Sequence, residues 1–437
     1  MSSYRGIPDG ARIRLAKNTS NLFRPRTASD VPGLDVSGLD GVIDVDVAAR
    51  TADVQGMCTY EDLVDAVLPF GLIPTVVPQL RTITLGGAVT GLGIESTSFR
   101  NGLPHEAVLE MDVLTGAGDL VTARPDGEHA DLFEAFANSY GSLGYATRLR
   151  IELEAVPGYV TLRHVPFDAE SATRAIAAIC ETGEWEGVRV DGLDGTAFDP
   201  DDVRLTLATF TDEPGPTSDY TGQDVYYRSI AERTTDRLTM HDYLWRWDTD
   251  WFWCSAAFGA QNPWVRRVWP RRWRRSDVYH RLVGLDTRFG LSRLLDRVKG
   301  VPGREKVIQD VEVPLERLPA FLAWFDAEVG MRPVWVCPLR TRRPWPAYPL
   351  EPGRTYVNIG FWGTVEVPAD APDGMVNRRI EERVHLLGGH KSLYSEAFYD
   401  EETFAGLYGV DALDTVRRRY DPAGRLSTLY DKAVGNS

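Results

Sequence analysis

The sequence predicts an α+β fold in two parts, and three observations lead to this prediction. Short strand-like segments of alternating apolar and polar residues fill residues 1–155, whereas amphipathic helices become frequent only from about residue 160. The length of 437 residues suggests two domains or one large composite. Apolar residues make up 43% of the chain and charged residues 25%, so we expect an ordinary folded core.

The first part begins with a short strand over residues 11–16 that enters a polar loop. Two alternating strands follow, with Arg50 and Thr51 near the turn between them. A helix then begins at Thr59, and Asp62 follows three residues later, as in a capping box. The other predicted features of this part are the apolar helix face of Leu63, Val64 and Val67, a hairpin over 107–123 and a strand over 145–156.

The second part mixes helices with strands and is predicted to be another α+β domain. Its predicted helices cover residues 171–183 and 314–330, and its predicted strands cover 203–211, 332–340 and 355–363. The end of the chain is helix-rich. We therefore place the domains at 1–158 and 159–385, with a C-terminal segment at 386–437.

Charge and cysteine usage exclude several classes of function. A net charge of -15 argues against generic nucleic-acid binding. The four cysteines are scattered without a CxxC pair, which indicates neither a zinc site nor a disulfide framework, so we expect no metal. No apolar signal segment and no run of 18 apolar residues occurs, and we expect a cytoplasmic protein.

The stretch "TITLGGAVTGLGIES", residues 82–96, is rich in glycine and has an acid, Glu95, next to its end. Glycines let a backbone approach a ligand, and the hydroxyls of Thr82, Thr84 and Thr90 would join a cluster of N–H donors suited to a pyrophosphate or to the edge of a flavin ring. The stretch is neither a Rossmann fingerprint, because Ser96 replaces the third glycine, nor a Walker loop. A plain tight turn is the alternative.

The order of elements resembles the FAD-binding domain of the vanillyl-alcohol-oxidase/PCMH flavoprotein superfamily. The motifs "LGGAVTGLGIESTSFRNGL" and "DLFEAFANSYGSLGYATRLRIEL" are similar to the Δ24-sterol reductase branch. The resemblance continues through "VIQDVEVPLERL", "RPVWVCPL" and "LYSEAFYDEETF", and so covers nearly the whole chain. "RLAKNTSNLFR", "GLDVSGL" and "MCTYEDLV" look like the actinobacterial flavoprotein reductases of 10-methyl-branched (tuberculostearic) fatty-acid synthesis.

This resemblance implies a two-part PCMH-type FAD-binding domain, a substrate or cap domain, and a C-terminal segment that returns to the flavin. Covalent members attach FAD through a histidine in the N-terminal loop; here the first histidine is His105, so FAD is expected to be non-covalent. The expected cofactor contacts are Lys17, Thr19, Ser20, Asn21, Pro78, Thr82, Thr84, Leu85, Gly86, Gly87, Thr90, Gly91, Gly93, Ile94, Ser96, Ser98, Gly102, Gly144 and Ile151.

Three residues are the candidates for catalysis. Glu95 matches a position near the isoalloxazine, where it would donate a proton or orient a donor; alternatively, it ties down its own loop by accepting backbone N–H bonds. Tyr394 aligns with a family tyrosine close to the flavin, and Asn358 is a weaker candidate on a strand. Lys391 and Tyr399 are weaker still.

Residues 243–281 hold seven of the twelve tryptophans, with eight arginines and three aspartates. Tryptophan prefers the membrane–water interface and arginine pairs with lipid phosphates, so membrane docking is one interpretation, with some tryptophans lining an acyl tunnel. A tryptophan-rich core with arginines on its outer face is the other structural interpretation. Single-stranded nucleic acid also suits basic and aromatic residues, but the overall charge argues against it.

The resemblance implies that NADPH reduces FAD and that the flavin reduces an isolated C=C bond in a lipid, most closely a 10-methylene acyl chain to a 10-methyl one. The implied partners are a phospholipid acyl chain, the inner face of the cell membrane and the methyltransferase of the same pathway. The alternatives are a Δ24-sterol-type reductase, an oxidase or dehydrogenase of an alcohol or sugar, and a lipid-binding protein with a degenerate flavin fold.

Overall fold

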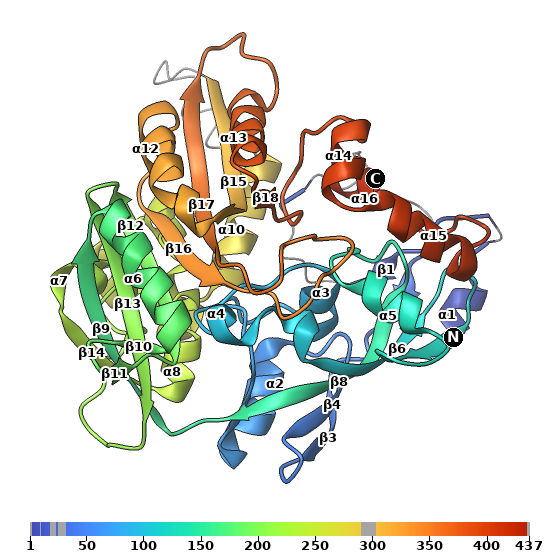
Figure 1. Cartoon of the computed structure of the whole chain (residues 1–437), viewed down its shortest axis with the longest axis horizontal. Coiled ribbons are helices and arrows are strands. Elements are labelled where there is room, and N and C mark those ends of the chain that lie inside the picture. The colour runs from blue at the N-terminus through green and yellow to red at the C-terminus, as the bar shows by residue number, and fades with distance from the viewer. Residues whose placement is uncertain (1, 9, 18–22, 25–31, 290–302, 435–437) are drawn as a thin grey trace.

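The computed structural model describes residues 2–8, 10–17, 23–24, 32–289 and 303–434. Two large antiparallel sheets organise this part of the chain, one in each predicted half (Figure 1). The α+β prediction is confirmed. None of the described helices is both long and apolar enough to cross a bilayer.

The first sheet has the strand order β3-β4-β8-β6-β7, with β5 paired to β8. Arg50 adopts a φ of 53° in the turn between β3 and β4, and Thr59 caps α2 by accepting the N–H of Asp62, as predicted. The apolar face of α2 is buried. The elements of this part are β3 (Val42–Asp46), β4 (Thr51–Gln55), α2 (Tyr60–Val67), β5 (Leu72–Pro74), α3 (Leu85–Thr90), α4 (Ser98–Asn101), β6 (Val108–Leu114), β7 (Leu120–Ala123), α5 (Ala130–Phe136) and β8 (Tyr145–Ala155).

The second sheet has the order β14-β9-β13-β12-β16-β17-β15-β18, and the predicted strands and helices of this part are confirmed. Helices α6, α12 and α13 cover one face, where their apolar side chains form a separate core with those of the strands (Figure 1). The elements are β9 (Tyr159–Phe167), α6 (Ala169–Thr182), β10 (Glu184–Trp185), β11 (Val188–Arg189), β12 (Gly192–Asp199), β13 (Asp202–Thr211), β14 (Thr235–Thr239), β15 (Gly303–Pro314), α12 (Leu318–Glu328), β16 (Val334–Leu339), β17 (Tyr356–Val367), α13 (Met375–Leu386) and β18 (His390–Lys391).

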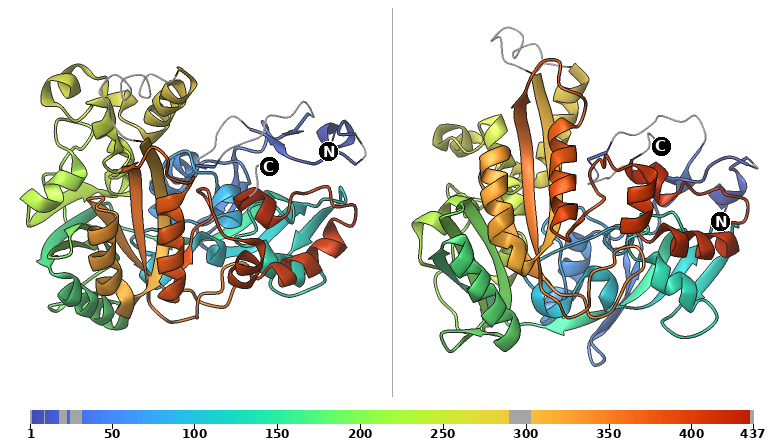
Figure 2. Two further views of the ribbon diagram at one scale, coloured as in Figure 1. Left: turned by 90° about the horizontal axis from the view of Figure 1, so that it is seen from above. Right: turned by 45° about the horizontal axis from the view of Figure 1, so that its top comes forward.

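Residues 240–289, which follow β14, lie on the opposite side of this sheet from α12 and α13 (Figure 2). They form short helices joined by tight turns. With α7 (Tyr226–Glu232) before β14, the helices here are α8 (Met240–Leu244), α9 (Pro263–Val268), α10 (Ser276–Phe289) and the 3-10 turns η3 (Asp248–Asp250), η4 (Cys254–Phe258) and η5 (Arg271–Trp273).

The C-terminal helices pack beside the first sheet's domain, near the N-terminus (Figure 1). The predicted strand over 11–16 shortens to β1 (Leu15–Ala16), because the N–H of Ile13 donates to the carbonyl of Arg425 at 2.8 Å instead of joining a sheet. The remaining elements are α1 (Ser2–Arg5), β2 (Leu34–Asp35), α14 (Glu401–Leu407), α15 (Val410–Tyr420) and α16 (Leu429–Ala433).

Candidate functional site

The glycine stretch forms a short helix, α3, which the sequence pattern did not predict. Its glycines are required by close packing on the protein itself. A Cβ on Gly86 would lie 2.6 Å from the carbonyl oxygen of Gly56, which is closer than two such atoms can approach. The bare backbone therefore lets α3 lie directly against the turn that precedes α2.

The threonine hydroxyls expected to face a ligand have partners within α3. Thr84 Oγ1 accepts the N–H of Gly87 at 3.2 Å as the helix N-cap, and Thr90 Oγ1 donates to the carbonyl of Gly86 at 2.7 Å. Both side chains thus stabilise the glycine-containing helix, which its composition alone would not support.

Available backbone donors lie after the helix rather than at its start. The N–H groups of Leu85 and Gly86 donate to protein carbonyls at 2.9 Å. In contrast, those of Leu92, Gly93 and Ile94 donate to no acceptor among the described residues, although Gly93 and Ile94 are buried. Buried N–H groups are almost always paired, so the donors of Gly93 and Ile94, with that of half-buried Leu92 beside them, indicate a binding position for a polar group.

A second set of unpartnered polar atoms comes from the loop before β8. Asn138 and Tyr140 have φ angles of 58° and 49°, and Gly144 has a φ of 139°, so the loop turns repeatedly through the left-handed region. The amide of Asn138 and the hydroxyl of Ser142 are each 2% exposed and bond to no described residue. The N–H of Tyr140 donates to the carbonyl of Thr90 at 2.6 Å, which holds this loop against α3.

The C-terminal helix α16 adds a cation to this loop. Lys432 Nζ donates to the carbonyls of Tyr140 and Gly141 at 3.1 and 3.0 Å. Burial, together with the nearby positive charges of Arg24 and other basic residues, lowers the pKa of Lys432 to about 7. Such a cluster of basic side chains favours binding of an anion.

These observations fit a bound dinucleotide: unpartnered N–H donors and an amide for its polar edges, and a cationic cluster for its pyrophosphate. The residues that would hold it are Lys17, Leu92, Gly93, Ile94, Asn138, Ser142 and Lys432. Lys17 is half-buried and belongs to the charges that act on Lys432. Thr19, Ser20 and Asn21, also expected here, lie outside the described residues.

The other expected cofactor contacts lie around α3 or in the central sheet. Ile151 lies in β8, between β4 and β6, and Gly102 ends α4 with a φ of 76°. Gly93 packs between Pro78 and Pro104, and Ser98 Oγ accepts the N–H of Glu95 at 3.0 Å. Leu85, Gly87 and Gly91 are part of α3 or end it, Ser96 Oγ bonds to Tyr243, and Thr82 precedes the helix.

Glu95 belongs to a buried ionic network rather than standing alone. Arg246 contacts Glu95 Oε1 at 3.1 Å and Asp194 Oδ2 at 3.0 Å, and its guanidinium lies 4.0 Å from the ring centre of Tyr243. Glu95 also accepts hydrogen bonds from Gln79 and from the N–H of Ser96. Burial raises the pKa of Glu95, and the charge of Arg246 opposes that rise. Glu95 thus ties down its own loop by accepting a backbone N–H, as the alternative interpretation predicted.

Tyr394 and Asn358 meet at a residue that the sequence reasoning missed, Asp310 on β15. Asn358 Nδ2 donates to Asp310 Oδ1 at 3.2 Å, and the hydroxyl of Tyr394 interacts with this carboxyl. Trp362 Nε1 donates to the Tyr394 hydroxyl at 2.8 Å. Burial raises the pKa of Asp310 to about 7, so this side chain holds its proton at or near neutral pH.

The Asp310 cluster adjoins accessible space and aromatic rings. Asp310, Tyr394 and Trp362 lie deep in the fold, yet each is only half-buried, so part of each side chain remains accessible. The ring of Phe252 lies 4.2 Å from that of Trp362, and Phe23 packs edge-on against Tyr394 at 6.0 Å. A titratable acid thus lies among apolar rings, an arrangement common at catalytic sites.

Lys391 and Tyr399 make contacts that stabilise the fold. Lys391 Nζ is buried and pairs with Glu381 Oε1 at 2.5 Å, and Tyr399 packs against the ring of Tyr408 at 6.2 Å.

The sequence held a signal for Asp310 in "VIQDVEVP". Strand alternation places Asp310 and Glu312 on one face, and two acids within an apolar strand are unusual. No local pattern distinguishes Lys432 or Arg246.

The tryptophan-rich segment is partly core, as one of its two structural interpretations predicted. Trp245, Trp247 and Trp251 are buried, and Trp247 Nε1 donates to Asp194 Oδ2 at 2.9 Å. The arginines differ from that interpretation, because Arg246 and Arg266 are 1% exposed rather than on the outer face.

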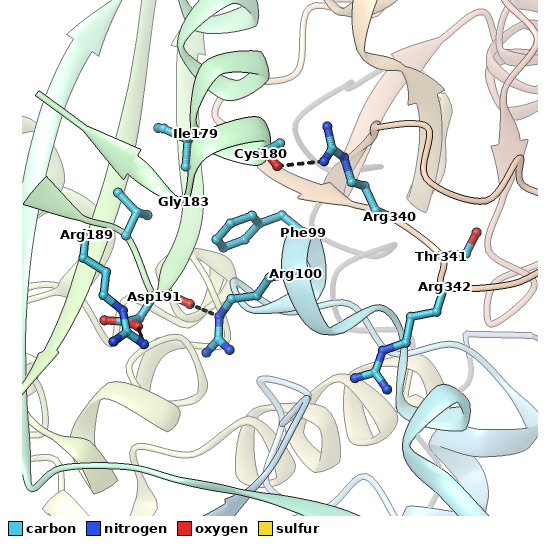
Figure 3. A pocket seen from close by; sticks show the side chains of 11 residues that line it. Phe99, Arg100, Ile179, Cys180, Gly183, Arg189, Asp191, Arg340, Thr341 and Arg342 are labelled. Carbon is cyan, nitrogen blue, oxygen red and sulfur yellow. Dashed lines mark hydrogen bonds and ion pairs between the residues drawn. The ribbon is translucent and has the colours of Figure 1, made fainter. Parts of the chain in front are cut away.

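A separate cavity of about 420 Å³ lies between α4, α6 and the end of β16 (Figure 3). Four arginines line it, and each has a protein partner: Arg100 bonds to the carbonyl of Asp191, Arg189 to the Asp191 carboxylate, Arg340 to the carbonyl of Cys180 and Arg342 to Glu152. Because these guanidinium groups are already paired, we assign the cavity no function.

Comparison with known proteins agrees with this geometry. Residues 9–124 match the family model of the FAD binding domain. The Δ(24)-sterol reductase of Rattus norvegicus is 23% identical over 90% of this chain and 75% of that protein, and the Δ(24)-sterol reductase of Arabidopsis thaliana is 22% identical over 92% and 76%. Cytokinin dehydrogenase 6 of Oryza sativa is 41% identical over 25% of this chain and 21% of that protein. The chain therefore contains a PCMH-type FAD-binding domain and is an FAD-binding oxidoreductase related, across both of its parts, to the Δ(24)-sterol reductases.

Proposed function

We propose that this protein uses NADPH and non-covalent FAD to reduce an isolated C=C bond in a lipid, converting a 10-methylene acyl chain to a 10-methyl one. The observation that carries the proposal is the Asp310–Tyr394 pair, an acid whose pKa burial raises to about 7 and which interacts with a phenol among aromatic rings. The similarity to Δ(24)-sterol reductases over nine tenths of the chain supports a C=C bond as the target.

Bound FAD, once reduced by NADPH, supplies a hydride, so the protein must supply one proton for each bond reduced. An isolated alkene accepts hydride poorly, and proton delivery must accompany or precede it. Tyr394 gives its hydroxyl proton to one alkene carbon and takes a proton from Asp310 in the same motion. This relay avoids a free phenolate, which burial disfavours by raising the pKa of Tyr394.

Positive charge develops at the more substituted alkene carbon as the proton arrives. The faces of Phe252 and Trp362 would stabilise that charge, and the apolar surroundings would exclude water. Asn358 holds the Asp310 carboxyl in place through its 3.2 Å hydrogen bond. Glu95 and Arg246 position the loop that follows α3.

Reduction of a Δ24 sterol is the second candidate, because the similar proteins include Δ(24)-sterol reductases and both substrates give a tertiary centre. Anaerobic flavin spectroscopy distinguishes these candidates from an oxidase. NADPH should bleach the flavin of the purified holoprotein, and a 10-methylene phospholipid should restore its colour faster than a Δ24 sterol or oxygen. Rapid reoxidation by oxygen with neither lipid effective would overturn the proposal.

A further inference from the structure

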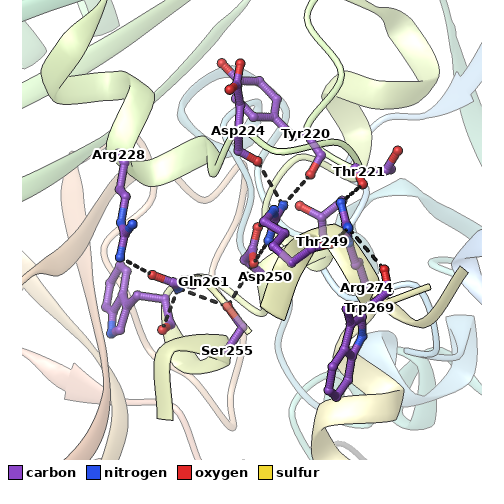
Figure 4. Close-up of polar contacts among 12 residues, drawn as sticks. Tyr220, Thr221, Asp224, Arg228, Thr249, Asp250, Ser255, Gln261, Trp269 and Arg274 are labelled. Atoms are coloured by element: carbon purple, nitrogen blue, oxygen red, sulfur yellow. Dashed lines mark hydrogen bonds and ion pairs between the residues drawn. The ribbon is translucent and has the colours of Figure 1, made fainter. Parts of the chain in front are cut away.

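Residues 259–275, which lie between η4 and α10 and form one surface turn with α9 and η5, are held in place by buried arginine side chains. Arg266, which is 1% exposed, contacts Asp250 Oδ1 at 2.7 Å and the carbonyl of Gly222 at 2.8 Å. Arg274 bonds to the carbonyl of Thr221 (Figure 4) and to that of Gly222. Charged hydrogen bonds inside the protein fix this backbone, so its outer surface is presented in one orientation.

The outer surface of the same turn carries large apolar side chains. Trp264 is 78% exposed and Val268 is 80% exposed, and their i, i+4 spacing places them on one side of α9. Trp273 in η5 is 47% exposed. Exposed tryptophan and valine on a fixed turn cost hydration free energy, which is the usual sign of a surface that contacts something else.

Arginines surround these apolar side chains. Arg267 and Arg272 are exposed and form no ion pair with any residue the structure describes, while Arg271 pairs with Asp219 at 2.8 Å on the surface. The chain as a whole carries a net charge of -15, so this positive surface stands apart from the rest. Its charge is complementary to an anionic bilayer.

We propose that Trp264, Arg267, Val268, Arg271, Arg272 and Trp273 form a docking surface for an anionic phospholipid bilayer. Tryptophan and valine enter the interface, and the arginines pair with lipid phosphates. Trp251, in the same tryptophan-rich segment (residues 243–281), contacts the candidate site through Phe23. The ring of Trp251 stacks on Phe23 at 5.8 Å, and Phe23 packs against Tyr394. A membrane lipid as substrate, which rests on the proposed function, would therefore approach from this side.

Vesicle co-sedimentation of the full-length holoprotein tests the docking surface. We expect the protein to sediment with vesicles of phosphatidylcholine and phosphatidylglycerol, and less with phosphatidylcholine alone or at high salt. The double variant W264A/W273A should lose about tenfold or more in partitioning, and R267E/R272E should lose its preference for phosphatidylglycerol. Leu386→Ala, at another side chain that is 70% exposed, is the matched control and should bind like the wild type.

Three results would overturn the docking surface: no sedimentation of the wild type with anionic vesicles at low salt, unchanged sedimentation of W264A/W273A, or binding to a labelled single-stranded oligonucleotide in preference to vesicles. Turnover of a detergent-dispersed substrate separates this proposal from the proposed function. The docking variants should keep that turnover, whereas a wrong assignment of the reaction would leave vesicle binding intact.

Discussion

The hydroxyl of Tyr394 interacts with the carboxyl of Asp310 although the two residues come from distant parts of the chain, and Trp362 donates to the same tyrosine hydroxyl at 2.8 Å. The pairing depends on β18, which adds to the edge of β15 and brings the following residues over that strand. Gly360 lies opposite Asp310, and a Cβ there would collide with the carboxyl. The backbone is thus arranged to accommodate this acid.

Removing the acid should slow the reaction without releasing the cofactor. Asp310→Asn keeps the size of the side chain and its bond to Asn358 but has no acidic proton, so we expect kcat to fall about 100-fold or more with FAD still bound. Tyr394→Phe should lower kcat by a similar factor. The double variant should be little worse than either single variant, because both remove one relay. Additive losses in single-turnover rates would refute the relay.

The pKa of Asp310 predicts a pH profile. The acid is protonated below about pH 7 and ionised above it, so the rate should fall as pH rises through 7. Since the folded state holds this proton and the unfolded chain releases it near pH 4, stability should also fall between about pH 4 and 7. Urea unfolding at pH 5 and pH 8 should show a smaller pH dependence in Asp310→Asn than in the wild type.

Lys432 should bind the cofactor's negative charge. Lys432→Met should weaken FAD binding, measured by the quenching of flavin fluorescence in apoprotein titrations. Because the pKa of Lys432 is lowered to about 7 and an anion would raise it, binding takes up a proton above pH 7, and wild-type affinity should fall as pH rises. Wild-type pH dependence retained in Lys432→Met would contradict this role. Lys306→Met, at an exposed lysine on β15, is the control.

The buried network around Arg246 should dominate local stability. Arg246→Met would leave Glu95 and Asp194 facing each other without a cation, at a cost of about 3–5 kcal/mol in the free energy of unfolding. Glu95→Gln should cost less and should leave the pH profile of the rate unchanged, because Asp310 sets it. If Glu95→Gln instead removes the pH dependence, Glu95 is the proton donor.

The packing of α3 gives a simple test with a matched control. Gly86→Ala would place a methyl group 2.6 Å from the carbonyl oxygen of Gly56, so we expect a loss of about 1–3 kcal/mol in unfolding experiments and weaker FAD binding. A Cβ on Gly158 would meet nothing within 4 Å, and Gly158→Ala should be tolerated. Equal stability of both variants would mean that α3 does not lie against Gly56.

Regular periodicity made most of the fold predictable, whereas long-range contacts did not. The Thr59 cap and the alternating strand over 145–156 follow from neighbouring residues alone. Helix α3 does not, because glycine disfavours helices and only contact with Gly56 explains it. The site divides in the same way: the glycine stretch and Tyr394 are visible in motifs, and "VIQDVEVP" marks Asp310 as unusual, but only the assembled sheet brings Asp310 next to Tyr394.

Conversion of a defined lipid tests the proposed reaction most directly. Purified holoprotein should be incubated anaerobically with NADPH and a 10-methylene phospholipid, followed by mass analysis of the released fatty acids. We expect each acyl chain to gain two hydrogen atoms, with one NADPH consumed per chain. A methylene chain of unchanged mass, with the flavin bound and reduced by NADPH, would contradict the assignment.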